Sequence, residues 1–291
     1  MNIIGHQKII KLLNRSIEKD AVNHSYLFTG PESVGKFALA FDFAQKLSGS
    51  KEKINPDIEI VAPEISEEKG VIKKKDIKIE RIKELQHWAS LSAQGARKVA
   101  IIDDADRLTQ AAQNSLLKIL EEPGDNVVMI LAAQNEKKIL PTIISRCQKI
   151  RLNPLSDAKI AEAIPAGIAD KNDIIFWSLG RPGIAVKMLS DKSELELRKE
   201  SAKELADLFS ENAADRFSLA ENMSKDVSKA VEKIKFWIVV LRSSLYSGVG
   251  GVEISDQKKF SLIEKMSESL ALLRETNTNA RLILENLFLE F

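Results

Sequence analysis

The sequence predicts an α/β domain built on a parallel sheet, then a small helical domain and a larger all-α domain. In the first half of the chain, short apolar runs typical of buried strands alternate with stretches of helical periodicity. This alternation is typical of a parallel sheet that helices cover on both faces. After residue 154 the strand patterns disappear, and helical periodicity continues to the end.

The α/β domain is expected to cover residues 1–153. Apolar and β-branched runs predict strands at residues 25–28, 57–63, 97–106 and 126–133, with a further short strand after residue 146. Helical periodicity predicts helices at residues 9–17, 36–47, 79–91 and 109–123. The polar segments 48–56 and 66–76 are expected to form loops. The lysine run 73–75 could contact a phosphate backbone, but so short a charge run is more typical of a solvated loop.

The helical part is expected to divide into residues 154–192 and residues 193–291. Short helices are predicted at residues 156–164, 173–179 and 184–189, and glycine and proline at 180–183 separate the last two. The larger domain is helical in pattern throughout, with a break predicted at residues 247–256.

Composition excludes several classes of protein. The 43 basic and 42 acidic residues leave a net charge of +1, so no overall charge indicates nucleic-acid binding. The longest apolar runs, such as residues 236–241, are too short to span a bilayer, so no membrane partner is expected. Cys147 is the only cysteine, which excludes a disulfide framework and a cysteine-rich zinc site. A cytoplasmic location is predicted.

A phosphate-binding loop is the main candidate site. The segment GPESVGK lies between a predicted strand and a predicted helix, and it places Gly30, Gly35 and Lys36 in the GxxxxGK pattern. In a working loop of this kind, backbone N–H groups surround the phosphates and the lysine reaches the terminal ones. The pattern therefore predicts a nucleotide site.

Two residues argue against efficient hydrolysis at this loop. Phe37 stands where a serine or threonine hydroxyl would bind magnesium. Ser33 stands where many such loops have a glycine, which adopts positive φ without steric cost. The sequence therefore predicts that ATP and magnesium bind weakly or not at all.

Two aspartates follow the predicted strand VAII. Asp103 would position magnesium in a P-loop enzyme, and Asp104 stands where a carboxylate would polarise the attacking water. Asp104 could equally be an N-terminal anion for the helix that begins near Thr109. Both interpretations of Asp104 stay open at this point.

Three motifs, in this order, resemble the clamp-loader branch of the AAA+ ATPases: GPESVGK, IIDDADRLTQAAQNSLLKILEEPGDNVVMILAAQNE and ISRC. The opening IIGHQKIIKLLNRSI, the segment NPDIEIV and the closing NTNARLILENLFLEF are also similar to that family. The resemblance spans the chain, but it is dense only at residues 2–152.

The resemblance implies a subunit of a ring-like pentamer that opens a sliding clamp and places it on primed DNA. Such a subunit has an AAA+ domain, a lid and a helical collar, which correspond here to residues 1–153, 154–192 and 193–291. The implied partners are the motor subunits and the delta subunit of the loader, the clamp, and DNA reached through the complex.

The resemblance is to the stationary member of this pentamer, which does not hydrolyse ATP itself. That member donates the arginine of its SRC motif, here Arg146, to ATP held by a neighbouring subunit.

The chain departs from the family pattern in two places. Cysteines that commonly bind zinc before the second strand are absent from residues 48–55, so no metal is expected there. In active relatives a sensor arginine comes a few residues after a glycine–serine pair, whereas here Arg181 directly follows Gly180. Contact between Arg181 and a nucleotide is therefore not predicted.

Two alternatives to a non-hydrolysing subunit remain. An active clamp-loader ATPase would rely on Lys36, Asp103 and Asp104 without a hydroxyl at position 37. A P-loop enzyme unrelated to replication, such as a nucleotide kinase, would need a substrate pocket and lid arginines where this chain has a long helical tail.

Overall fold

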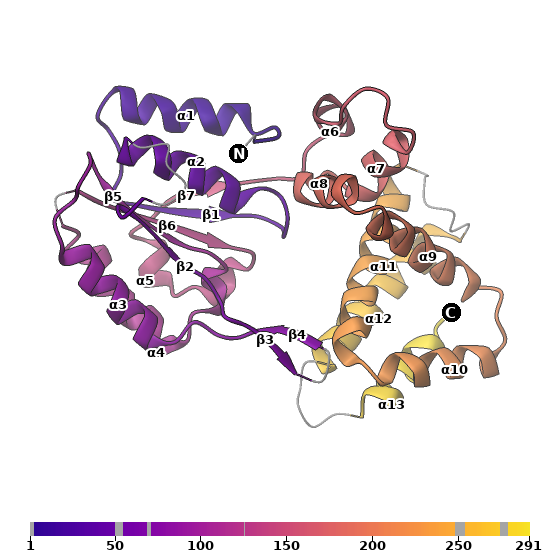
Figure 1. Ribbon diagram of the computed structural model, residues 1–291. Helices are drawn as coiled ribbons and strands as arrows, with labels where there is room; N and C mark the ends of the chain where they lie inside the picture. The colour runs from indigo at the N-terminus through magenta and orange to yellow at the C-terminus, as the bar shows by residue number, and fades with distance from the viewer. Residues whose placement is uncertain (1–2, 50–54, 69–70, 125, 248–253, 274–278) are drawn as a thin grey trace. The chain divides into compact units, whose positions relative to one another are not determined.

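The computed structural model describes residues 3–49, 55–68, 71–124, 126–247, 254–273 and 279–291. The chain divides into two compact units, Met1–Val186 and Lys187–Phe291. The first holds a parallel sheet with surrounding helices, and the described part of the second is helical (Figure 1). This confirms the predicted fold class, while the three-domain division at residues 153 and 192 stays a prediction.

A five-stranded parallel sheet forms the centre of the first unit (Figure 1). Its strands lie in the order β2-β5-β6-β1-β7, and every neighbouring pair is parallel. The strands are β1 (Ser25–Thr29), β2 (Ile58–Val61), β5 (Lys98–Ile102), β6 (Val127–Ala133) and β7 (Gln148–Arg151). All five predicted strands are confirmed. The three inner strands β5, β6 and β1 are buried along their whole length, as expected of strands covered on both faces.

Helices cover both faces of this sheet. Alternate residues of β5 enter different cores: Val99 and Ile101 pack toward α1 and α2, whereas Ala100 and Ile102 pack toward α3 and α4. This division follows from the two-residue period of a strand. The helices around the sheet are α1 (Gln7–Glu18), α2 (Lys36–Ser48), α3 (Ile79–Ser90), α4 (Gln110–Glu121) and α5 (Pro141–Ile144), with 3₁₀ turns η1 (Ala105–Arg107) and η2 (Glu136–Lys138).

The prediction of a loop at residues 66–76 is wrong. β3 (Ile65–Glu68) and β4 (Val71–Lys74) pair antiparallel and form a hairpin separate from the main sheet (Figure 1). The β-branched Ile65, Val71 and Ile72 favour extended backbone. The surrounding charged residues conceal this short signal in the sequence.

The rest of the described chain is helical, as predicted. The first unit adds α6 (Asp157–Ala163), α7 (Lys171–Ser178) and the start of α8 (Pro182–Ser190). The second contains α9 (Lys192–Asp207), α10 (Ala213–Ser224), α11 (Val227–Ser247), α12 (Asp256–Leu272) and α13 (Ala280–Phe288). The predicted break falls between α11 and α12, and residues 248–253 within it lie outside the described residues. No helix in the described ranges is long and apolar enough to cross a membrane.

Trp237 on α11 joins three helices in the core of the second unit. Its side chain is fully buried. Its Nε1 donates a hydrogen bond to the Ser201 carbonyl of α9 at 2.7 Å, and its ring centroid lies 6.1 Å from that of Phe288 on α13. Burial of this large side chain with its polar atom paired should contribute strongly to the unit's stability.

We expect Trp237→Ala to lower the free energy of unfolding by about 3–5 kcal/mol, because it leaves a cavity and removes the hydrogen bond to the Ser201 carbonyl. Chemical denaturation of the full chain measures this loss. Phe260→Ala on α12 is the control, since the Phe260 side chain is 63% exposed and its removal should change stability by about 0.5 kcal/mol or less. Equal losses for the two variants would contradict the assignment of Trp237 to the core.

Candidate functional site

The phosphate loop and the two aspartates lie at the same edge of the sheet. Gly30 follows the carboxyl end of β1, and Asp103 follows the carboxyl end of β5. β6 lies between these strands and is parallel to both, so Gln134, which follows β6, lies between the two groups. The carboxyl edge of a parallel α/β sheet is the usual place for ligands.

The loop between β1 and α2 has three residues at positive φ, namely Gly30, Ser33 and Gly35. A Cβ at Gly30 would lie 2.2 Å from the Leu152 carbonyl oxygen, so this close approach requires glycine. Gly35 has φ 103° and directly precedes α2. Ser33 adopts φ 61°, which costs a non-glycine residue free energy. The surrounding structure therefore holds the loop in shape although position 33 lacks the usual glycine.

The ammonium of Lys36 turns back onto its own loop. Its Nζ donates to the carbonyl of Gly30 at 2.8 Å and to that of Pro31 at 2.7 Å. Burial lowers the pKa of Lys36, and the negative charges of Asp103 and Asp104 act in the opposite direction. A phosphate group must compete with both carbonyls for this ammonium.

Two further groups bind the loop from outside it. Nε2 of His6 lies 2.9 Å from the Val34 carbonyl, and the Gly183 N–H donates to the Ser33 carbonyl at 2.9 Å. Gly183 lies in the first turn of α8, just after Arg181. Sequence reasoning did not single out His6 or Gly183 as site residues, because no local pattern predicts contacts across such separations.

Asp104 is paired with a lysine that sequence reasoning assigned to a solvated loop. Nζ of Lys74, at the end of β4, lies 2.6 Å from Oδ2 of Asp104. Nε2 of Gln134 donates to Oδ1 of Asp104 at 3.4 Å. Asp104 does not cap α4, because the N-cap is Thr109, whose side chain accepts from the Ala112 N–H.

These contacts do not fit a magnesium–nucleotide complex. The ring of Phe37 stacks on Phe41, with centroids 6.1 Å apart, and offers no oxygen. Burial raises the pKa of Asp103, and the adjacent charge of Asp104 raises it further. Among the residues that the structure describes, no three acidic, histidine or cysteine side chains gather as a metal site.

Arg146 lies at the opposite edge of the sheet. It precedes β7, which runs parallel to β1 with Gln148 opposite Tyr26. The hydroxyl of Ser25, the first residue of β1, donates to the Arg146 carbonyl. Since Gly30 follows the other end of β1, the strand separates the Arg146 backbone from the phosphate loop by roughly 15 Å.

The guanidinium of Arg146 is held at the surface by neighbouring helices. Nη1 donates to the Thr142 carbonyl of α5 at 2.9 Å. Nη2 lies 2.8 Å from Oε1 of Glu121, the last residue of α4. The Arg146 side chain remains 36% exposed, so an ion pair of this kind can exchange for a stronger anion at little cost.

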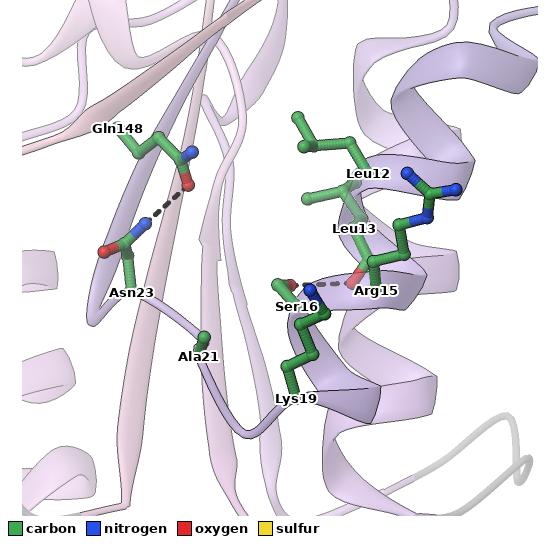
Figure 2. A pocket seen from close by; sticks show the side chains of 8 residues that line it. All are labelled: Leu12, Leu13, Arg15, Ser16, Lys19, Ala21, Asn23 and Gln148. Carbon is green, nitrogen blue, oxygen red and sulfur yellow. Dashed lines mark hydrogen bonds between the residues drawn. The ribbon is translucent and has the colours of Figure 1, made fainter.

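A pocket of about 290 Å³ lies near the end of α1 (Figure 2). Arg15 and Lys19 project from α1, and the side chains of Asn23 and Gln148 are hydrogen-bonded at 2.6 Å. The lining residues are Leu12, Leu13, Arg15, Ser16, Lys19, Ala21, Asn23 and Gln148. None of the predicted site residues lines this pocket.

The sequence is similar to those of DNA polymerase III and replication factor C subunits. A sequence model of a family described as "DNA polymerase III, delta subunit" matches residues 5–156. DNA polymerase III subunit delta' of Bacillus subtilis is 33% identical over 174 residues, which cover 54% of this chain and 50% of that protein. A replication factor C small subunit of Methanococcus maripaludis is 26% identical over 288 residues, covering 91% of this chain and 87% of the relative.

A solved structure shares the fold over nearly the whole chain. It is a DNA polymerase III gamma subunit-related protein of Thermotoga maritima, with a TM-score of 0.57 and 19% identity, covering 96% of this chain and 97% of that one. By sequence, the chain spans about half the length of the first curated relatives that it matches.

Cys147, beside Arg146, is partly buried against the core. Burial raises the pKa of its thiol to about 11, although a hydrogen bond with Ser25 acts in the opposite direction. The thiol therefore stays protonated at neutral pH, and the thiolate is the form that reacts with alkylating agents.

The rate of Cys147 alkylation by iodoacetamide should therefore rise about tenfold per pH unit between about pH 7.5 and 9.5, since both values lie below the pKa of about 11. Glutathione is the control, because an ordinary thiol with a pKa near 8.5 levels off across that range. Mass spectrometry of the intact chain gives the rate. A plateau for Cys147 at about pH 9 would contradict the raised pKa.

Proposed function

Because the chain belongs to the DNA polymerase III delta subunit family, we propose that it is a delta-prime-like subunit of the bacterial clamp loader. In this role it helps to load the sliding clamp onto primed DNA during replication. Its partners are the motor subunits and the delta subunit of a hetero-pentamer, the clamp, and DNA reached through the complex. This role places it in the cytoplasm.

The observation that carries the proposal is the position of Arg146 relative to the chain's own phosphate loop. The parallel register of β1 and β7 puts Arg146 and Gly30 at opposite edges of the sheet. A partly exposed guanidinium at the sheet edge opposite its own phosphate loop is suited to act on a neighbouring subunit. There it would neutralise charge that develops on the γ-phosphate, an effect of roughly 10³–10⁵ in rate in related systems.

The contacts of the chain's own loop support a non-hydrolysing role. Lys36 is bonded to two loop carbonyls, Phe37 lacks a metal ligand, and Asp104 is paired with Lys74. An active clamp-loader ATPase is the second candidate, since Asp103 is retained at the end of β5. Membership of the family argues against a P-loop enzyme unrelated to replication.

The isolated chain should release no phosphate from ATP above the uncatalysed rate, with or without magnesium and primed DNA. The physical reason is that the loop has no hydroxyl ligand at position 37 and its lysine is engaged. The assembled complex under the same conditions is the positive control. Turnover by the isolated chain that Lys36→Ala abolishes would favour the active ATPase.

Arg146→Ala should slow ATP hydrolysis at the adjoining site of the assembled complex by roughly 10³–10⁵-fold, without preventing assembly. Single-turnover kinetics on the reconstituted complex measures this step. Arg81→Ala is a matched control, because Arg81 is also an ion-paired surface arginine, 40% exposed and 3.3 Å from Glu59. Unchanged hydrolysis by Arg146→Ala at equal assembly would remove the trans role.

A further inference from the structure

We propose that Lys74 is a built-in cation that neutralises Asp104 and thereby excludes a divalent metal ion from the chain's own phosphate loop. This inference rests on the part of the proposed function in which the chain does not hydrolyse ATP at its own phosphate loop. It extends that part by naming the residue that keeps the site closed to a magnesium–nucleotide complex.

The carboxyl edge of the sheet requires positive charge near Asp104. The Asp104 side chain is only 9% exposed, and a buried carboxylate without a partner is costly. The charges of Glu32, Asp103 and Asp106 act on Lys36 together with that of Asp104, so several carboxylates share this edge. In a P-loop enzyme, bound magnesium is the largest positive charge at such a place, and the residue expected to position it here is Asp103, next to Asp104. The charge of Lys74 acts on Asp103 as well as on Asp104, so a cation paired with Asp104 also repels a metal ion at Asp103.

Lys74 supplies a positive charge at this edge. Its Nζ lies 2.6 Å from Oδ2 of Asp104, while Gln134 donates to Oδ1, so protein donors satisfy both carboxylate oxygens. Burial lowers the pKa of Lys74, but the hydrogen bond and charge of Asp104 outweigh this effect and raise the pKa above its ordinary value. The ammonium therefore remains charged at neutral pH.

The backbone around Lys74 is fixed beside Asp104. The Lys74 carbonyl accepts a hydrogen bond from Nη1 of Arg107 at 2.8 Å. Just after the hairpin, the Ile77 N–H donates to the Arg107 carbonyl at 2.9 Å, and the Ile77 carbonyl accepts from the Thr109 N–H at 3.0 Å. These bonds tie the end of the hairpin to the segment that follows Asp104. The position of Lys74 thus does not depend on its flexible side chain alone.

The next lysine, Lys75, forms an exposed ion pair at the end of the same hairpin. Lys75 is 53% exposed and lies 3.7 Å from Glu64, which is more exposed still. Such surface pairs contribute little to stability. Lys75 therefore provides a matched control on the same hairpin, next to Lys74 in the sequence.

The test is the effect of Mg²⁺ on the melting temperature of the isolated full chain. Lys74→Met removes the charge and keeps most of the side-chain volume. We expect its melting temperature to fall by about 2–4 °C, and millimolar Mg²⁺ to restore at least half of that loss by binding the released carboxylate. Wild type and Lys75→Met should show no comparable response to Mg²⁺.

The double variant Lys74→Met/Asp104→Asn removes both charges, so it should melt close to wild type and show no Mg²⁺ response. This variant also decides the question if Lys74→Met alone does not fold. Three results would overturn the proposal. The first is an Mg²⁺ response of wild type equal to that of Lys74→Met, and the second is no Mg²⁺ response of folded Lys74→Met. The third is a double variant that is unfolded or still responds to Mg²⁺. Arg146 takes no part in this measurement, so its result and that of the trans role are separate.

Discussion

The parallel pairing of β1 with β6 on one side and β7 on the other is the constraint on which the rest of the site depends. At the carboxyl edge it brings Gly30 beside the end of β6, which carries Gln134, with the end of β5 and Asp103 one strand further. At the amino edge it places Arg146, whose carbonyl accepts from the first residue of β1. A chain with this register holds its phosphate loop and Arg146 at opposite edges of the sheet, which is the separation that the proposed action on a neighbouring subunit requires.

The phosphate loop is packed against several elements of the first unit. Val34 is fully buried, Gly30 lies against the Leu152 carbonyl, and the first turn of α8 is hydrogen-bonded to Ser33. The loop therefore joins β1, the end of β7 and α8, and these contacts do not need a nucleotide. Phe37 on α2 stacks with Phe41, and both rings pack partly buried against the core between the sheet, α1 and α2.

Much of the fold and the core of the candidate site could be predicted from the sequence, because the carboxyl ends of parallel strands all lie at the same edge of a sheet. The GxxxxGK pattern predicted the position of Lys36, and the apolar run at residues 99–102 predicted that of Asp103 at a strand end. The SRC motif singled out Arg146. The β3–β4 hairpin and the pairing of Lys74 with Asp104 could not be predicted, because the contact joins residues 30 positions apart. The sequence of a lysine run does not show which of its ammonium groups pairs with a buried carboxylate. Nor does the sequence show the contact partner of an isolated histidine such as His6.

The most direct measurement of the central claim is a cryo-electron microscopy structure of the assembled complex with a non-hydrolysable ATP analogue. The account predicts that the Arg146 guanidinium leaves Glu121 and contacts the γ-phosphate of a nucleotide bound by the adjoining subunit. It also predicts that Lys36 of this chain stays bonded to the Gly30 and Pro31 carbonyls. A nucleotide bound in this chain's own loop, with Arg146 still paired to Glu121, would contradict the account.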